Sequence, residues 1–134
     1  MGADFGVKKM LVLHMKPSEH VSVDKDQLGA LYSQLGEAGA EDIVCRALEE
    51  LALRLSHCNE MYHNKNWPTL RKNARSLIAI GDQIGMKVLT RVAGDVTTCI
   101  DVGDSIALAA TLSRLIRVGE RSLNVVWDTH DTPI

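Results

Sequence analysis

The sequence predicts an all-α fold, an up-down-up-down four-helix bundle with a short leading helix. From Asp24 to Leu123, apolar residues recur every three or four positions, which is the period of one helix face. Residues that typically start or end helices divide this region into five segments. The last four are joined by only a few residues, and such short connections place consecutive helices antiparallel.

The first two predicted helices differ in length. The leading helix starts after Asp24, whose carboxylate can cap it, and ends at Gly36 and Gly39. We expect it to lie across one end of the bundle. The second helix runs from about Glu41 to Tyr62. Its apolar stripe is Val44, Ala47, Leu48, Leu51, Leu55, Cys58 and Tyr62.

The third predicted helix starts at Asn66, a plausible N-cap, and stops at Gly85. Pro68 falls in its first turn, where the missing N–H costs nothing. Its predicted inner face is Leu70, Ala74, Leu77, Gly81 and Ile84.

The last two predicted helices run from Met86 to about Val102 and over 105–123. Gly103 ends the first of them, and Asp104 can cap the second. The stripe of the earlier helix is Leu89, Val92, Ala93, Val96, Cys99 and Ile100. The stripe of the final helix is Leu108, Ala109, Leu112, Leu115, Ile116, Gly119 and Leu123.

These elements divide the chain into an N-terminal arm (1–23), the helical bundle (24–123) and a C-terminal tail (124–134). The apolar run of the arm has no second strand to pair with, and it is too short for a signal peptide or a membrane span. The tail has Trp127 as its one anchor, and we expect its polar end to fray.

The composition excludes several classes of partner. The chain of 134 residues has a net charge of −2, which provides no basic field for nucleic acid or acidic lipid. Its aromatic residues, 4% of the total, form no cluster on which bases could stack. Its 3 cysteines have no metal-ligand spacing and are expected to be core residues in a reducing compartment. We expect a cytoplasmic protein with no nucleic-acid or membrane partner.

No pattern in the sequence predicts a catalytic, cofactor or metal site. The phosphate-binding loop, the nucleophile elbow and the HExxH motif are missing. His57 and His63 are six residues apart, whereas two metal ligands on one helix face should be three or four apart. Glu49 and Glu50 are adjacent, so they point about 100° apart and cannot act as a facing acid–base pair. We therefore expect a protein that is not an enzyme.

The stretch NARSLIAIGDQIGM (73–86) carries the most specific pattern, in Ala74, Leu77, Ile84 and Gly85. With these residues the chain resembles the histidine-containing phosphotransfer (HPt) domains of bacterial phosphorelays. In that family one helix of a four-helix bundle carries an exposed His in a pattern A-H-x-L-K-G, and an apolar residue followed by Gly closes the helix. NWPTLRKNARSL before this stretch and LTRVAGDVTTCIDVGD after it also look like the family, so the resemblance covers about 24–123.

The chain departs from the family at the residues that matter for chemistry. Arg75 stands at the position of the phosphoacceptor His, Ile78 at that of the Lys and Ala79 at that of the Gly. A guanidinium stays protonated and has no lone pair with which to attack an aspartyl phosphate. The resemblance therefore implies a pseudo-phosphotransferase, a phosphotransfer scaffold without its phosphoacceptor.

The helical period places the residues around Arg75 on one outer surface, which we call the Arg75 strip. Its members are Arg71, Lys72, Arg75, Ile78, Ala79 and Asp82. Receiver domains, the usual partners of the HPt family, present an acidic pocket in which an Arg could form a forked hydrogen bond. We expect the strip to bind the receiver domain of a response regulator or hybrid kinase without carrying phosphate.

Three alternatives remain open at this stage. The chain could be an active phosphotransfer protein that uses His57, which we expect near the level of Arg75. It could be a helical scaffold or dimeric interaction module unrelated to phosphorelay, with a homodimer face over the strip. The strip could also be a solvated basic face without a partner. Acid-labile phosphate on a His, weaker receiver binding on Arg75→Ala, and an apolar dimer face would distinguish them.

Overall fold

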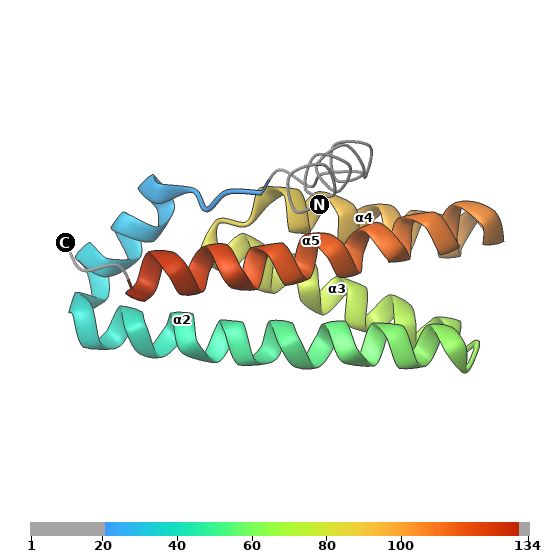
Figure 1. The fold of residues 1–134 in the computed structure, drawn as a ribbon, viewed down its shortest axis with the longest axis horizontal. Helices are drawn as coiled ribbons and strands as arrows, with labels where there is room; N and C mark the ends of the chain where they lie inside the picture. Colours follow the sequence, from blue (N-terminus) through green and yellow to red (C-terminus); the bar gives the residue numbers. More distant parts are fainter. Residues whose placement is uncertain (1–20, 132–134) are drawn as a thin grey trace, which may run out of the picture.

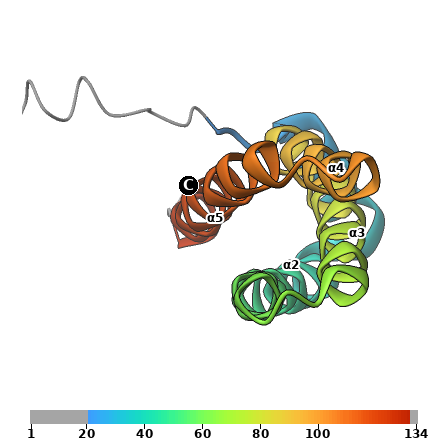
Figure 2. The same ribbon diagram turned by 90° about the vertical axis from the view of Figure 1, so that its right-hand side faces the viewer.

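The computed structural model describes residues 21–131, with the side chains of 21–126, and this part contains four helices and no strand. The helices are α2 (Lys25–His63), α3 (Trp67–Ile84), α4 (Lys87–Val102) and α5 (Ser105–Asp131). Each packs against the next along the chain, and α5 returns to contact α2 (Figure 1). Viewed end-on, the helices occupy four corners, with α2 diagonal to α4 (Figure 2). The predicted all-α four-helix bundle is confirmed.

The predicted leading helix is present as the first part of α2, before a kink at Gly36. Gly36 leaves the helical conformation, with φ 77° and ψ 170°, and the helix resumes directly after it. The predicted end of the leading helix at Gly36 is confirmed, but Gly39 lies within the helix that follows. One residue at positive φ suffices to turn the chain, and glycine adopts that conformation without strain. The part of α2 that precedes the kink crosses the end of the bundle toward the α3–α4 turn (Figure 1).

The leading part is joined to the α3–α4 turn by polar contacts. The Asp24 amide donates to the Gly85 carbonyl at 3.0 Å, and the Lys87 ammonium lies 3.2 Å from Asp24 Oδ2. Asp24 Oδ1 also accepts from the amide of Gln27 at 3.1 Å, as the predicted N-cap should. The side-chain amide of Gln27 donates to the carbonyl of Asp82. These contacts place the start of α2 beside the end of α3.

The capping carboxylate of Asp24 should make stability depend on pH. Its pKa lies below the ordinary 3.8 because it accepts the Gln27 amide and the Lys87 ammonium. A lowered folded-state pKa adds stability above the unfolded-state pKa, and this stability is lost as pH falls through the folded-state value. We expect Asp24→Ala to lower the melting temperature at pH 7, with a smaller difference from wild type below pH 3.8. A difference independent of pH would contradict this assignment.

The other helix ends follow the predicted pattern. Asn66 Oδ1 accepts from the Thr69 amide at 3.3 Å, and Asp104 Oδ1 accepts from the Ala107 amide at 3.0 Å. Gly85 and Gly103 end α3 and α4 in the left-handed conformation. These caps confirm the predicted boundaries of the three connections.

The last helix is longer than predicted. The sequence predicts its end at about Leu123, but α5 continues to Asp131, and Val126 is buried against the core. The first added turn keeps Val126 on the inner face, so the helix still packs beyond the predicted end. Residues 1–20 of the predicted arm, 132–134 of the tail and the Trp127 side chain lie outside the described part.

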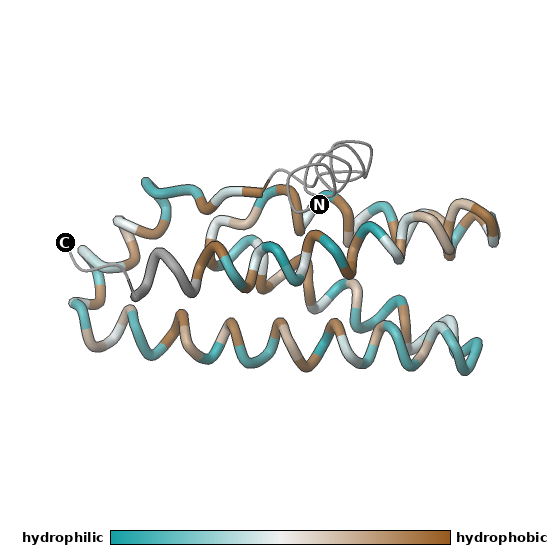
Figure 3. The backbone as a smooth tube through the Cα atoms, viewed as in Figure 1, coloured by the Kyte–Doolittle hydropathy of each residue, from teal (hydrophilic) through white to brown (hydrophobic). Residues whose placement is uncertain are grey.

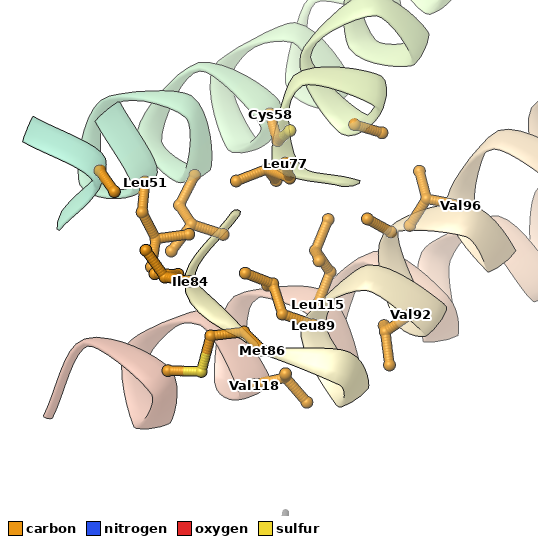
Figure 4. Packing of buried hydrophobic residues seen from close by; sticks show 14 of the residues in the cluster. Leu51, Cys58, Leu77, Ile84, Met86, Leu89, Val92, Val96, Leu115 and Val118 are labelled. Carbon is orange, nitrogen blue, oxygen red and sulfur yellow. The ribbon is translucent and has the colours of Figure 1, made fainter. Parts of the chain in front are cut away.

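The core lies between the four helices and confirms most of the predicted stripes. Apolar positions alternate with polar ones along the helices (Figure 3), and the apolar side chains meet inside the bundle (Figure 4). On α5, Ala109 is exposed, while Val118 and Ser122 are buried instead. Fully buried large side chains include Leu51, Leu70, Leu77, Ile84, Met86, Leu89, Val92, Val96, Leu115 and Val118.

Gly85 combines a positive φ with a close contact, so it should not tolerate a side chain. Its φ is 78°, and an added Cβ would lie 2.9 Å from the Cβ of Asp24 and 3.2 Å from its amide nitrogen. We expect Gly85→Ala to lower the free energy of unfolding by about 2–3 kcal/mol. Gly94 is the matched control, because it is helical and an added Cβ meets nothing within 4 Å. Gly94→Ala should raise stability by about 0.5–1 kcal/mol. Chemical denaturation measures both, and equal effects would contradict the turn geometry.

Candidate functional site

The Arg75 strip lies on the outer side of α3. Its inner face is taken up by the predicted apolar residues, all buried, so residues in the opposite phase face outward. Lys72, Arg75, Ala79 and Asp82 are exposed. Ile78 is partly buried and packs against the core, as expected for a residue at the edge of the bundle. The predicted exposure of Arg75 is confirmed.

Arg71 is the member of the strip that the structure assigns differently. Its guanidinium forms a forked ion pair with Asp101 of α4, with Nε 2.8 Å from Oδ1 and Nη2 2.9 Å from Oδ2. The hydrogen bond from Arg71 holds the pKa of Asp101 below its ordinary range, and the same bond raises the pKa of Arg71. The charge of Arg71 is thus already neutralised. Asp101 is not among the predicted members of the strip.

Arg75 and Lys72 carry the remaining positive charge of the strip. Among the described residues, neither side chain forms an ion pair or a hydrogen bond. The charge of Arg75 also contributes, after the larger effects of Arg71, to the low pKa of Asp101. Its guanidinium therefore stands near the Arg71–Asp101 pair with its donors open to solvent.

The C-terminal end of the strip, at Asp82, is held by contacts with α4 and with the start of α2. Asp82 Oδ1 accepts from Thr90 Oγ1 of α4 at 3.4 Å, and its carbonyl accepts from the side chain of Gln27. Gly81 lets α3 and α4 approach closely here, because an added Cβ would collide with Thr90 Oγ1 and lie 3.1 Å from the Met86 carbonyl oxygen. These contacts and the close packing of α3 on α4 hold this end of the strip in place.

A polar network on the other side of α3 was not predicted. Asn73 is only 4% exposed, its Nδ2 donates to the Thr69 carbonyl at 3.0 Å, and its Oδ1 accepts from Arg54 Nη1 at 3.1 Å. Arg54 Nε also donates to Glu50 at 3.1 Å. A buried amide needs such partners, and here they join α2 to α3. A polar Asn between the apolar positions of α3 was the only signal of it.

The register of α2 against α3 places His57 away from Arg75. Arg54 pairs with Asn73, and the amide of Asn66 donates to the carbonyl of Met61 at 2.9 Å. In this antiparallel register His57 lies level with Leu70, about 7.5 Å along the axis from Arg75 at 1.5 Å per residue. It is also half-buried. The expectation that His57 lies near the level of Arg75 is not met.

The cysteines are free and differ in burial. Cys58 is fully buried, and burial raises the pKa of its thiol to about 12, so the nucleophilic thiolate is scarce at neutral pH. Cys45 and Cys99 are only partly buried, so the expectation of three core cysteines holds fully for Cys58 alone.

A second surface of interest lies at the α4–α5 turn. Val102 is 73% exposed and Ile106 84% exposed, and Trp67 at the start of α3 is 37% exposed. Trp67 also lines a hollow beside this turn, and we call the three side chains together with the hollow the apolar end. The hollow is lined by Trp67, Cys99, Ile100, Gly103, Ser105 and Leu108.

In residues 21–131, no three His, Cys, Asp or Glu side chains are grouped to hold a metal ion. No helix of this part is both long and apolar enough to span a membrane. Comparisons of the chain with protein-family models, with curated proteins and with solved structures gave no match.

Proposed function

We propose that this chain is an HPt-like signalling domain that binds the receiver domain of a response regulator or hybrid kinase without carrying phosphate. The observation that carries this proposal is that Arg75, on α3 of an antiparallel four-helix bundle, is exposed and unpaired within the described part of the chain. This is the position that matches the phosphoacceptor His in the sequence resemblance. The proposed activity is binding rather than catalysis.

The chemistry of the strip suits an acidic concave partner. A guanidinium offers donors in a fixed fork that matches a carboxylate, and it cannot accept a phosphoryl group. Lys72 adds a second cation one turn away, and the small Ala79 leaves room for an approaching backbone. The half-buried Ile78 offers an apolar edge for the contact. Together these residues support a contact of moderate size centred on Arg75.

His57 remains the alternative phosphoacceptor, with less support. It is half-buried and lies level with Leu70, away from the exposed strip. An attacking imidazole must reach the aspartyl phosphate of a docked receiver, which requires exposure at the centre of the contact. The open guanidinium of Arg75 is better placed for such a contact.

Titration of receiver domains against the isotopically labelled chain tests the proposal. We expect at least one receiver to shift the amide resonances of Lys72, Arg75 and Ala79, with little change on α5. The absence of binding by a full panel of receivers from the source organism would overturn the proposal. Binding that shifts only resonances of the apolar end would also contradict it.

The apolar end favours a second candidate function, a small self-associating interaction module. Three large apolar side chains are exposed at one end of the bundle, and such grouping is typical of contact surfaces. Light scattering at increasing concentration tests this alternative. A dimer in wild type that Ile106→Glu converts to a monomer would support it, and a monomer throughout would exclude it.

A further inference from the structure

The ion pair between Arg71 and Asp101 leaves the strip with fewer available cations than its sequence provides. Arg71 and Arg75 are four residues apart on α3, so both side chains leave the helix on the same side. Within the described residues all donors of Arg75 are open, whereas the Nε–Nη2 edge of Arg71 is occupied by the two oxygens of Asp101, at 2.8 and 2.9 Å. The Asp101 carboxylate thus occupies the fork that a partner's carboxylate would otherwise fill.

A purely structural role for this pair is poorly supported by its surroundings. The side chains of Arg71 and Asp101 are 35% and 52% exposed, and ion pairs with that exposure contribute little to stability. The packing of α3 on α4 is already provided by buried residues such as Leu77 and Leu89, and by the close approach at Gly81. Loss of the pair should therefore change the charge of the strip far more than the fold.

We infer that Asp101 is a specificity-determining residue that masks Arg71 and limits the strip to the cations of Arg75 and Lys72. This inference rests on the proposed function insofar as the natural partner is a receiver with an acidic pocket. A strip with one free guanidinium suits a pocket that admits one arginine. It binds general acidic surfaces more weakly than a strip with two free guanidinium groups would.

Asp101→Asn should unmask Arg71. We expect this variant to bind a hexaglutamate peptide about three- to tenfold more tightly than wild type at low salt, because a second guanidinium becomes available. The gain should diminish with added salt, since exposed charges are screened. Adding Arg71→Gln to Asp101→Asn should remove the gain. Chemical-shift titration measures these affinities, and thermal unfolding should show that the variants keep the wild-type fold.

Asp95→Asn is the matched control. Asp95 is also exposed on α4, forms no ion pair within the described residues, and loses the same formal charge. We expect the fold-change in hexaglutamate affinity caused by Asp95→Asn to be less than half of the fold-change caused by Asp101→Asn. An equal gain in both variants would show that only net charge matters and would overturn the inference. Unchanged or weaker binding by Asp101→Asn would overturn it as well.

Receiver titrations with the same variants separate this inference from the proposed function. If wild type binds a receiver, and Asp101→Asn changes the affinity for neither hexaglutamate nor that receiver, the inference fails while the proposed function stands. If Asp101→Asn tightens hexaglutamate binding but neither protein binds any receiver, the masking by Asp101 stands while the proposed function fails.

Discussion

Replacing Arg75 with Glu is expected to weaken receiver binding by about a hundredfold, which corresponds to about 2.7 kcal/mol. The change removes the open guanidinium at the centre of the strip and places a carboxylate against the acidic pocket of the partner. Because Arg75 is exposed and forms no ion pair in the described part of the chain, the melting temperature should stay close to that of wild type. Calorimetric titration with the tightest-binding receiver measures the affinity.

Arg121→Glu is the control for this charge reversal. Arg121 is exposed on α5, and α5 lies diagonally across the bundle from α3 (Figure 2). Its reversal should change the affinity by less than about threefold, because exposed charges farther apart than a Debye length are largely screened. Equal losses in the two variants would indicate a general charge effect and would contradict a contact centred on Arg75.

Truncating Leu77 to Ala should have the largest effect on stability, a loss of about 3–4 kcal/mol in the free energy of unfolding. Leu77 is fully buried on the inner face of α3 and lies within the cluster of core side chains (Figure 4). The truncation removes buried methyl groups and leaves a cavity that the surrounding helices fill only in part. For a domain of ordinary stability this is a large fraction of the total.

Leu53→Ala on α2 is the matched control, because Leu53 is 47% exposed. Its truncation should change stability by less than about 1 kcal/mol. Urea denaturation followed by circular dichroism compares the two variants. A loss below 1 kcal/mol for Leu77→Ala, or equal losses for both, would show that α3 does not pack as described.

The fold was largely predictable because helical periodicity and caps are local signals. The apolar period identified every buried residue of α3 except Asn73, and Gly85 and Gly103 marked helix ends. The break at Gly36 was predicted, but its extension to Gly39 was wrong, because glycine in a sequence does not reveal whether the chain leaves the helix for one residue or for several. The continuation of α5 to Asp131 was missed because Ser122 interrupts the apolar stripe just before Val126.

The site was less predictable because its main contacts join different helices. Helical phase sufficed to place Arg75 and Ala79 on the surface. The Arg71–Asp101 pair joins residues 30 positions apart, and side-chain direction at that separation depends on how the helices pack. Likewise, the burial of Asn73 depends on Arg54 of α2, which satisfies its amide oxygen.

The most direct test of the central claim is a phosphotransfer measurement. The chain would be incubated with a panel of phosphorylated receiver domains, and both the acid-labile phosphate on the chain and the lifetime of each phosphorylated receiver would be recorded. We predict no phosphate on the chain, and a change in at least one receiver lifetime that Arg75→Ala abolishes. Phosphate on His57 or His63 would contradict it and would identify an active relay protein.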